Sequence, residues 1–524
     1  MATTPQRAYR AACPNCGAPV EFASAASASA VCSFCRSTLV RDGDALRRIG
    51  VSAELFDDHS PLQLGAAGKY QGAAFTLVGR LQYGYAEGTW NEWHALFDSG
   101  KSGWLSEDNG AYVIAFDAPL QAAAPAAGEL VVGERRLVSG AAWSVASVTR
   151  AHLIAAQGEL PRPPRLDGSE FVVVDLRNER GDVATLDYGD AAAVEWSIGR
   201  SVRLAELQMT GLREASEKTL SGRGFQCPSC GASLQLTLQS TQSIACPQCK
   251  AVIDVSQGIG GDLAHYAQDN AGHDGAQPLI ALGASGRLTL DGREVQWQVV
   301  GYQERCDVPA DDDEATYWRE YLLYNRQEGF VFLVDTEDGW SWVKPLTGAP
   351  QVRGDVATWA GRSYRQRERY QAKVTWVLGE FYWRVQRDEV ALVADYAGTG
   401  AASQRRLSSE RTAGELTWSE GAVVDAQAVA RAFGIAAAAA PALQRSGARV
   451  MVDGGSLKVG LIIAVVLVVL LLGFCSSSER DCGDVRATFG EASNEYQQCL
   501  RNAGSGRSFR GGSFGGFSSG GGHK

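Results

Sequence analysis

Eight of the twelve cysteines stand in CxxC pairs whose spacing suits one metal ion for every four sulfurs. In each set, 15 residues separate two CxxC pairs, and four thiolates at such intervals match the tetrahedral coordination that zinc prefers. The predicted ligands of two structural Zn²⁺ ions are Cys13, Cys16, Cys32, Cys35, Cys227, Cys230, Cys246 and Cys249. A redox dithiol or an iron–sulfur cluster is the alternative. Four sulfurs leave no open position for water, so we expect the ions to stabilise structure without catalysing hydrolysis.

The residues around these cysteines predict two small β ribbons, at residues 1–50 and 221–255. Gly17 and Gly231 follow the first CxxC pairs, where a positive φ lets the chain leave a tight turn. Four short apolar stretches flank the cysteines and are predicted as ribbon strands: Val20–Phe22, Leu39–Val40, Leu234–Leu236 and Val252–Ile253. Metal binding worth on the order of 10 kcal/mol would stabilise modules that have almost no core of their own.

The sequence after the first ribbon is repeated after the second. The matching segments are Trp90–Trp93 with Trp318–Tyr321, Gly103–Leu105 with Gly329–Val331, Gly158–Leu160 with Gly379–Phe381, and Trp196–Ser197 with Trp418–Ser419. We therefore expect a tandem duplication, roughly 1–215 and 216–435. The repeated domains would occupy 60–215 and 279–435, joined by a linker at 256–278.

Short apolar runs separated by turn residues predict that these repeated domains are built from β-strands. Val295, Trp297 and Val299 alternate with glutamines, as in a half-buried strand. Further strands are predicted at Phe75–Val78, Tyr112–Phe116, Phe171–Leu176, Phe330–Val334, Trp340–Val343, Val374–Leu378 and Phe381–Val385. Only Leu204–Lys218 and Ala422–Phe433 look helical. The fold class expected is mainly β: two zinc ribbons, two antiparallel barrel-like or sandwich-like domains, and one C-terminal transmembrane helix.

The membrane prediction rests on Val459–Cys475, 17 residues without a charge. At about 1.5 Å per residue this run covers roughly 25 Å, and flanking residues extend it to a span at 457–476 after a linker at 436–456. No secretory signal precedes the ribbons, so we expect the N-terminal domains in the cytoplasm and a short external tail at 477–524, rich in Gly and Ser from about residue 502. Cys482 and Cys499 could form a disulfide in that tail or remain free thiols.

An enzymatic reading finds little support in the sequence. The chain has six histidines and no HExxH, phosphate-binding loop or nucleophile elbow. Glu159 and Glu380 recur after a glycine, but one acid without a partner base favours a turn or salt-bridge role. The 13 tryptophans are more typical of a packed β core than of a ligand-stacking surface. We therefore predict no catalytic residues and no organic cofactor.

The repeated motifs resemble those of a bacterial family known as domain of unknown function 4178. The residues that carry the resemblance in the first copy are Leu64–Arg80, Trp90–Trp93, Gly103–Trp104, Gly158–Pro161 and Glu195–Ser197. Those in the second copy are Leu282–Gly301, Trp318–Tyr321, Gly379–Phe381 and Leu416–Ser419. The resemblance implies no established activity. It implies a membrane-associated accessory role beside polyamine-synthesis and membrane-stress proteins.

These observations lead to one expected function and two alternatives. We expect a non-enzymatic zinc-ribbon adaptor or scaffold that binds a protein partner at the cytoplasmic face of a bacterial inner membrane. The first alternative is a membrane-tethered nucleic-acid-binding regulator, because residues 1–50 carry an excess of basic residues although the whole chain has a net charge of -10. The second is a binding protein or enzyme for a small cationic metabolite such as a polyamine, held by Trp and acidic side chains.

Overall fold

The computed structural model describes residues 9–435 with short gaps. The gaps are residues 23–26, 43–44, 53–59, 87, 109–110, 166, 191–192, 214–223, 239–240, 256–262, 269–277, 309–314, 326–327, 337 and 387–388. The expected membrane helix, the external tail with Cys482 and Cys499, and the acidic run 311–314 all lie outside the described residues. Among the helices that are described, none has the length and apolar character needed to cross a bilayer.

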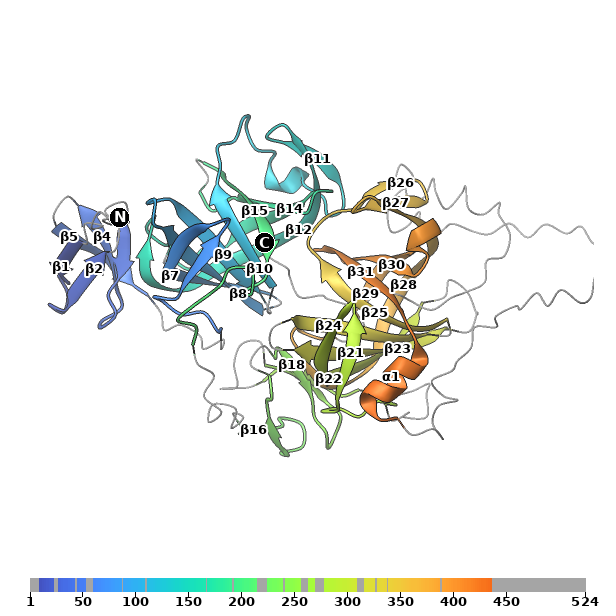
Figure 1. Cartoon of the computed structure of the whole chain (residues 1–524). Coiled ribbons are helices and arrows are strands. Elements are labelled where there is room, and N and C mark those ends of the chain that lie inside the picture. The colour runs from blue at the N-terminus through green and yellow to red at the C-terminus, as the bar shows by residue number, and fades with distance from the viewer. Residues whose placement is uncertain are drawn as a thin grey trace, which may run out of the picture. The chain divides into compact units, whose positions relative to one another are not determined.

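The first repeat contains a closed ring of antiparallel strands (Figure 1, blue to green). Around the ring the order is β7-β8-β9-β10-β15-β14-β13-β12, and β12 pairs back with β7. The bounds are β7 (Ala73–Tyr85), β8 (Gly88–Phe97), β9 (Ser102–Asp108), β10 (Ala111–Asp117), β12 (Ala141–Leu160), β13 (Phe171–Arg177), β14 (Asp182–Asp187) and β15 (Glu195–Val202). Two strands attach to the ring, β6 (Ala67–Tyr70) beside β7 and β11 (Arg135–Val138) beside β12, and the 3-10 helix η1 (Ala127–Glu129) precedes β11. The repeated domain is therefore a barrel.

The second repeat forms a ring with the same topology, β22-β23-β24-β25-β31-β30-β29-β28, closed by pairing of β28 with β22. The bounds are β22 (Arg293–Asp307), β23 (Tyr317–Asn325), β24 (Gly329–Thr336), β25 (Gly339–Leu346), β28 (Arg362–Phe381), β29 (Val390–Gly398), β30 (Arg405–Arg411) and β31 (Leu416–Val424). Outside the ring lie β21 (Ser285–Leu290), β26 (Gln351–Arg353), β27 (Val356–Trp359) and the 3-10 helix η3 (Gly400–Ala402). The shared strand order confirms the tandem duplication.

Each barrel continues into its ribbon through one long strand. The first ribbon contains β1 (Tyr9–Ala12), β2 (Pro19–Phe22), β3 (Ser29–Val31), β4 (Ser37–Asp42) and β5 (Ala45–Val51). The second contains β16 (Gly224–Gln226), β17 (Ser233–Gln235), β18 (Ser243–Ala245), β19 (Val252–Asp254) and β20 (His265–Tyr266). Strand β3 pairs with the end of β12, and β18 pairs with the end of β28. Ribbon and barrel in each repeat therefore share one sheet, and the predicted ribbon strands are confirmed.

Glycine is required where each long strand leaves its barrel. Gly158 and Gly379 have φ of 72° and 85°, in the left-handed region that side chains disfavour. A Cβ at Gly158 would lie 2.2 Å from the carbonyl oxygen of Val78, and one at Gly379 would lie 2.3 Å from that of Val300. Glycine is thus required in the repeated Gly-Glu pair because two backbones approach closely inside the sheet, and not because the chain turns in a loop.

Both faces of the second barrel's sheet are packed with apolar side chains. One face forms a cluster around Trp318, Phe332 and Trp383. The other includes Trp297 and is packed against α1 (Ala426–Phe433), whose Val429 is fully buried. Burial of tryptophan on both faces supports the packing interpretation of these residues.

Three local expectations from the sequence differ from the structure. Residues 203–208 form turns, and no α-helix occurs in the described part of Leu204–Lys218. Phe381 ends β28, and the predicted strand to Val385 is wrong because the next residues leave the sheet and Trp383 becomes fully buried. Of Ala422–Phe433, the first residues belong to β31 and only Ala426–Phe433 is helical.

The expected match of Gly103–Leu105 with Gly329–Val331 is also wrong, by two residues. Trp104 pairs with His94, and Phe332 pairs with Leu322, the residue that corresponds to His94. Trp104 therefore corresponds to Phe332, not to Phe330. Gly329-Phe330 and Gly103-Trp104 share a Gly-aromatic pattern, but strand pairing decides which residues of the two copies correspond.

Candidate metal centres

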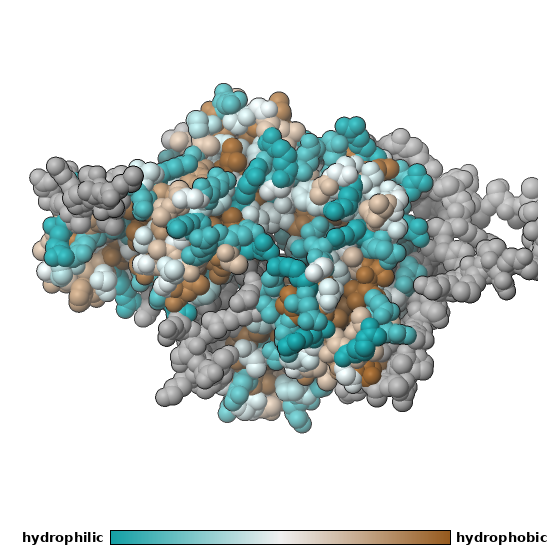
Figure 2. Space-filling view, in the orientation of Figure 1, coloured by the Kyte–Doolittle hydropathy of each residue, from teal (hydrophilic) through white to brown (hydrophobic). Residues whose placement is uncertain are grey.

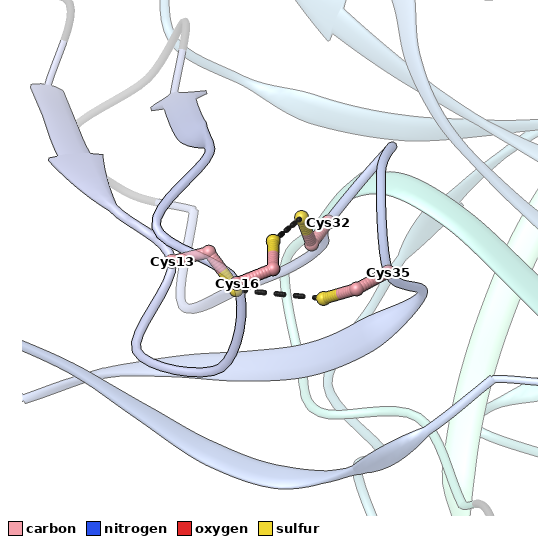
Figure 3. Close-up of side chains that lie close together, drawn as sticks. All are labelled: Cys13, Cys16, Cys32 and Cys35. Carbon is pink, nitrogen blue, oxygen red and sulfur yellow. Dashed lines mark hydrogen bonds between the residues drawn. The ribbon is translucent and has the colours of Figure 1, made fainter.

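Each CxxC pair lies in a tight turn that points two sulfurs to one side, and we call this turn a knuckle. The knuckle between β1 and β2 closes with a hydrogen bond from the Gly17 amide to the Cys13 carbonyl, 2.8 Å. Gly17 has φ of 76°, as its place after the second cysteine predicts. The facing knuckle, between β3 and β4, places Cys32 and Cys35 opposite the first pair (Figure 3).

The four sulfurs of the first ribbon surround one common point. Cys13 Sγ lies 3.6 Å from Cys35 Sγ, and Cys16 Sγ lies 3.7 Å from Cys32 Sγ. Sulfurs bound at about 2.3 Å to a common tetrahedral ion are about 3.8 Å apart, whereas a disulfide requires about 2.05 Å. The separations therefore fit four ligands around one metal ion and exclude disulfide bonds in this arrangement.

The second ribbon has the same geometry. Cys227 Sγ lies 3.7 Å from Cys249 Sγ, and Cys230 Sγ lies 3.8 Å from Cys246 Sγ. Its sulfurs, like those of the first ribbon, all lie within 4.8 Å of one another. Among the described residues, these two are the clusters of His, Cys, Asp or Glu that could hold a metal ion.

In the second knuckle of each ribbon, a residue other than glycine adopts a positive φ. Arg36 and Lys250 have φ of 56° and 62°, the values that glycine supplies in the first knuckles. Their amides donate to the carbonyls of Cys32 and Cys246, both at 2.9 Å. A basic residue directly after the last cysteine is the only sequence signal for this strained turn.

Hydrogen bonds around the clusters favour thiolate in one cysteine of each set. Hydrogen bonding to the Ser37 side chain, and then to Asn15, lowers the pKa of Cys35 to about 5. The backbone amide of Ala251 lowers the pKa of Cys249 to about 6. Thiolates are the species that bind metal.

A buried carboxylate joins the second ribbon to its barrel. Glu380, the next-to-last residue of β28, is 5% exposed. Its carboxylate accepts hydrogen bonds from the Thr237 amide at 2.7 Å and the Leu238 amide at 2.9 Å, and from the hydroxyls of Thr237 and Thr241. Glu380 is thus held by hydrogen bonds to residues of the second ribbon. It fixes the segment between the ribbon's two knuckles.

Replacing Glu380 by Gln should loosen this joint while leaving the barrel folded. A neutral amide cannot accept from two backbone amides and two hydroxyls at once, and hydrogen bonds to a charged group contribute about 1.5–3 kcal/mol. We expect faster hydrogen exchange at Thr237 and Leu238, measured by mass spectrometry. Glu294→Gln, at an exposed position of the same repeat, is the control. Equal exchange in both variants would contradict the role of Glu380.

His94 and Cys306 are two further residues buried in the repeated domains. His94 is buried, and its ring nitrogens lie 2.9 Å from the Glu159 carbonyl and 2.9 Å from the Ser102 hydroxyl. Burial lowers the pKa of His94, which favours the neutral ring. Cys306 is buried and burial raises the pKa of its thiol. The two ring contacts of His94 match a structural role for this residue.

The sequence analysis missed a buried ion network inside the second barrel. Arg305 Nη1 lies 2.8 Å from Glu410 Oε1 and 3.4 Å from Glu320 Oε1, and the Arg305 side chain is fully buried. Trp318 Nε1 and Gln303 Nε2 also donate to Glu320, at 2.7 and 2.6 Å. The available signal was Glu320, two residues after Trp318, which matches Glu92 two residues after Trp90 in the first copy.

Comparison with known proteins gives one family match. A family model described as "Domain of unknown function (DUF4178)" matches residues 63–204 and 286–426, together more than half of the chain. Each matched region follows one four-cysteine cluster. No curated protein and no solved structure matches the chain.

Proposed function

Since the chain belongs to the family described as Domain of unknown function (DUF4178), we propose from its own residues that it is a non-enzymatic zinc-ribbon adaptor for a protein partner. In this proposal each four-cysteine cluster holds one structural Zn²⁺. The apolar segment 457–476 tethers the chain to a bacterial inner membrane, with ribbons and barrels on the cytoplasmic side. The sulfur geometry supports zinc, and the uncharged run Val459–Cys475 supports the tether.

The observation that carries a partner-binding role is the surface of the first ribbon. Phe34, at the tip of its second knuckle, is 71% exposed, and Ile49 and Val51 of β5 are 39% and 49% exposed. In the described part of the second ribbon no large hydrophobic residue is exposed, and Gln248 stands where the first has Phe34. Figure 2 shows a face on which hydrophobic residues are scattered among hydrophilic ones. Exposed apolar residues grouped as on the first ribbon mark interaction surfaces.

The edge strand β5 favours a protein over other partners. Strand β5 ends the sheet order of the first repeat and pairs with β4 alone among the described strands. Its free edge can accept an extended peptide as an additional strand, with main-chain hydrogen bonds for affinity and side-chain contacts for specificity. Arg47 and Arg48 are exposed on β5, so the partner segment should carry acidic residues beside apolar ones.

Crosslinking in membranes tests this proposal with a matched pair of variants. The full chain is compared with Phe34→Ala and Gln248→Ala, which change the same knuckle position in the two ribbons. We expect one defined protein to crosslink to the unmodified chain and to Gln248→Ala, and its yield to fall at least fivefold in Phe34→Ala. Equal yields from all three proteins would refute the role of the first ribbon.

A nucleic-acid-binding regulator is the second candidate, because the same ribbon also exposes Arg36, Arg47 and Arg48 beside Phe34. Arginine with an exposed aromatic ring suits single strands, through phosphate contacts and base stacking. Retention of labelled single-stranded DNA or RNA that falls steeply with salt would favour this candidate. No retention at low salt would exclude it.

A further inference from the structure

The first barrel contains a cavity, and the second barrel has a fully buried arginine at a matching position. The cavity has a volume of about 390 Å³, and every strand of the ring β7-β8-β9-β10-β15-β14-β13-β12 contributes to its lining. It therefore lies within the ring of strands. Its size is at the lower end of the range for ligand pockets, which suits a small molecule.

The lining combines aromatic rings with an excess of carboxylates. Tyr83 stacks on Trp90 with ring centroids 5.0 Å apart, and Phe171 meets Tyr83 edge-on at 5.9 Å. The lining has two arginines, Arg162 and Arg165, and five carboxylates. The carboxylates are Glu92, Asp117, Asp187, Asp190 and Glu195. Aromatic faces and excess negative charge together suit an organic cation.

Strand pairing identifies the equivalent positions in the second barrel. Tyr83 lies opposite Trp90 in the β7–β8 hairpin, and Arg305 lies opposite Trp318 in the β22–β23 hairpin. Leu81 pairs with Glu92, as Gln303 pairs with Glu320. The second barrel thus has a guanidinium where the first has a tyrosine, beside a tryptophan and a glutamate that both barrels share.

A second carboxylate is also shared. Asp187 lies opposite Val173, and Glu410 lies opposite Val393, in the matching pairs β13–β14 and β29–β30. In the second barrel both carboxylates contact the Arg305 guanidinium, whose Cζ lies 5.6 Å from the centre of the Trp318 ring. The first barrel keeps both acids and the tryptophan but has no arginine at this position of β7.

The rim of the first cavity already accepts guanidinium groups. Arg165, from the segment after β12, reaches Asp187 at 3.4 Å and lies 4.7 Å from the centre of the Phe171 ring. Its side chain is 30% exposed, unlike the fully buried Arg305. Arg162 is held outward by Asp117, at 3.0 Å, and by Glu195. Neither arginine comes from the strand position that Arg305 occupies.

We propose that the cavity of the first barrel binds a small guanidinium-bearing molecule. Its cationic head lies between Glu92 and Asp187, in the place that Arg305 takes between Glu320 and Glu410. Its hydrocarbon part packs against Tyr83 and Trp90. Charge-assisted hydrogen bonds to two carboxylates and contact with aromatic rings both favour guanidinium over a neutral molecule of the same shape. This site does not depend on the adaptor function proposed above.

Isothermal titration of the full chain tests the proposal with n-butylguanidinium as the probe. We expect one saturable site per chain, because Arg305 already contacts the two carboxylates of the second barrel. n-Butylurea, a neutral molecule of similar shape, should bind at least tenfold more weakly. A short peptide with one central arginine distinguishes a free small molecule from an arginine side chain as the source of the guanidinium. Tighter binding of the peptide would assign the site to a protein ligand with the same chemistry.

Variants of two cavity-lining residues test whether the probe binds in the cavity. Tyr83→Arg introduces the guanidinium found in the second barrel and should abolish binding, while Glu294→Gln, at an exposed position of the second repeat outside the cavity, should bind as the unmodified chain does. Glu92→Gln should weaken binding at least tenfold and supports the test if Tyr83→Arg does not fold, as judged by circular dichroism. The proposal is overturned if butylguanidinium gives no saturable heat at millimolar concentration, if butylurea binds equally well, or if folded Tyr83→Arg and Glu92→Gln both keep full affinity.

Discussion

Arg305→Met should lower the free energy of unfolding of the second barrel by about 3–5 kcal/mol, the cost of leaving buried charges without their partner. Glu320 is fully buried and Glu410 nearly so, and both contact the Arg305 guanidinium. Methionine replaces the apolar stem of the arginine side chain but leaves two carboxylates without the guanidinium in an apolar interior. Denaturation in urea, followed by tryptophan fluorescence, measures the change.

The pH dependence of this destabilisation has a definite sign. Burial raises the pKa of Glu320 above its usual range even with Arg305 present, and loss of the guanidinium raises it further. An acid whose pKa is higher in the folded than in the unfolded state contributes stability below its unfolded pKa, and this contribution is lost as pH rises through the folded pKa. Arg305→Met should therefore be less destabilising at pH 5 than at pH 8.

A triple variant provides the control for Arg305. Replacing Arg305, Glu320 and Glu410 together by apolar residues of similar volume should restore most of the lost stability, because buried ion networks can be exchanged for hydrophobic packing at little net cost. The interpretation is wrong if Arg305→Met unfolds within 1 kcal/mol of the unmodified chain at pH 8.

Loss of metal should unfold each ribbon, with an expected effect on the order of 10 kcal/mol. We expect elemental analysis of the full chain to find two zinc ions. The count should fall to one in Cys16→Ser/Cys35→Ser and in Cys230→Ser/Cys249→Ser, because a tetrahedral site that has lost two sulfurs no longer holds its ion. Limited proteolysis should then cut the affected ribbon while its barrel remains intact.

Cys306 supplies the matched control for the metal-binding cysteines. It is a buried cysteine in β22, away from both four-sulfur clusters. Cys306→Ala should keep two zinc ions and intact ribbons. Iron in place of zinc, or one ion in the unmodified chain, would refute the paired zinc sites.

Local spacing was sufficient to predict the two four-cysteine clusters and the duplication. Cysteines two residues apart must share one turn, so the CxxC pattern alone brings Cys13 and Cys16 together, and the conserved 15-residue gap places a second pair opposite. Alternation in Val295–Val299 predicted a strand because side chains in strands alternate between faces. The helix expected at Leu204–Lys218 was wrong, since a helical composition does not outweigh turns packed against a barrel.

The amino-acid sequence by itself determined the four-sulfur clusters, the strand-rich class and the two copies, because these depend on neighbours within a few residues or on direct repetition. Only the tertiary structure decided that the strands close into barrels, that Glu380 fixes a ribbon to its barrel, and that Arg305 is buried between two carboxylates. Those features join residues that lie far apart in the chain, such as Arg305 and Glu410. Their contact depends on the pairing register around the whole ring, which no local pattern encodes.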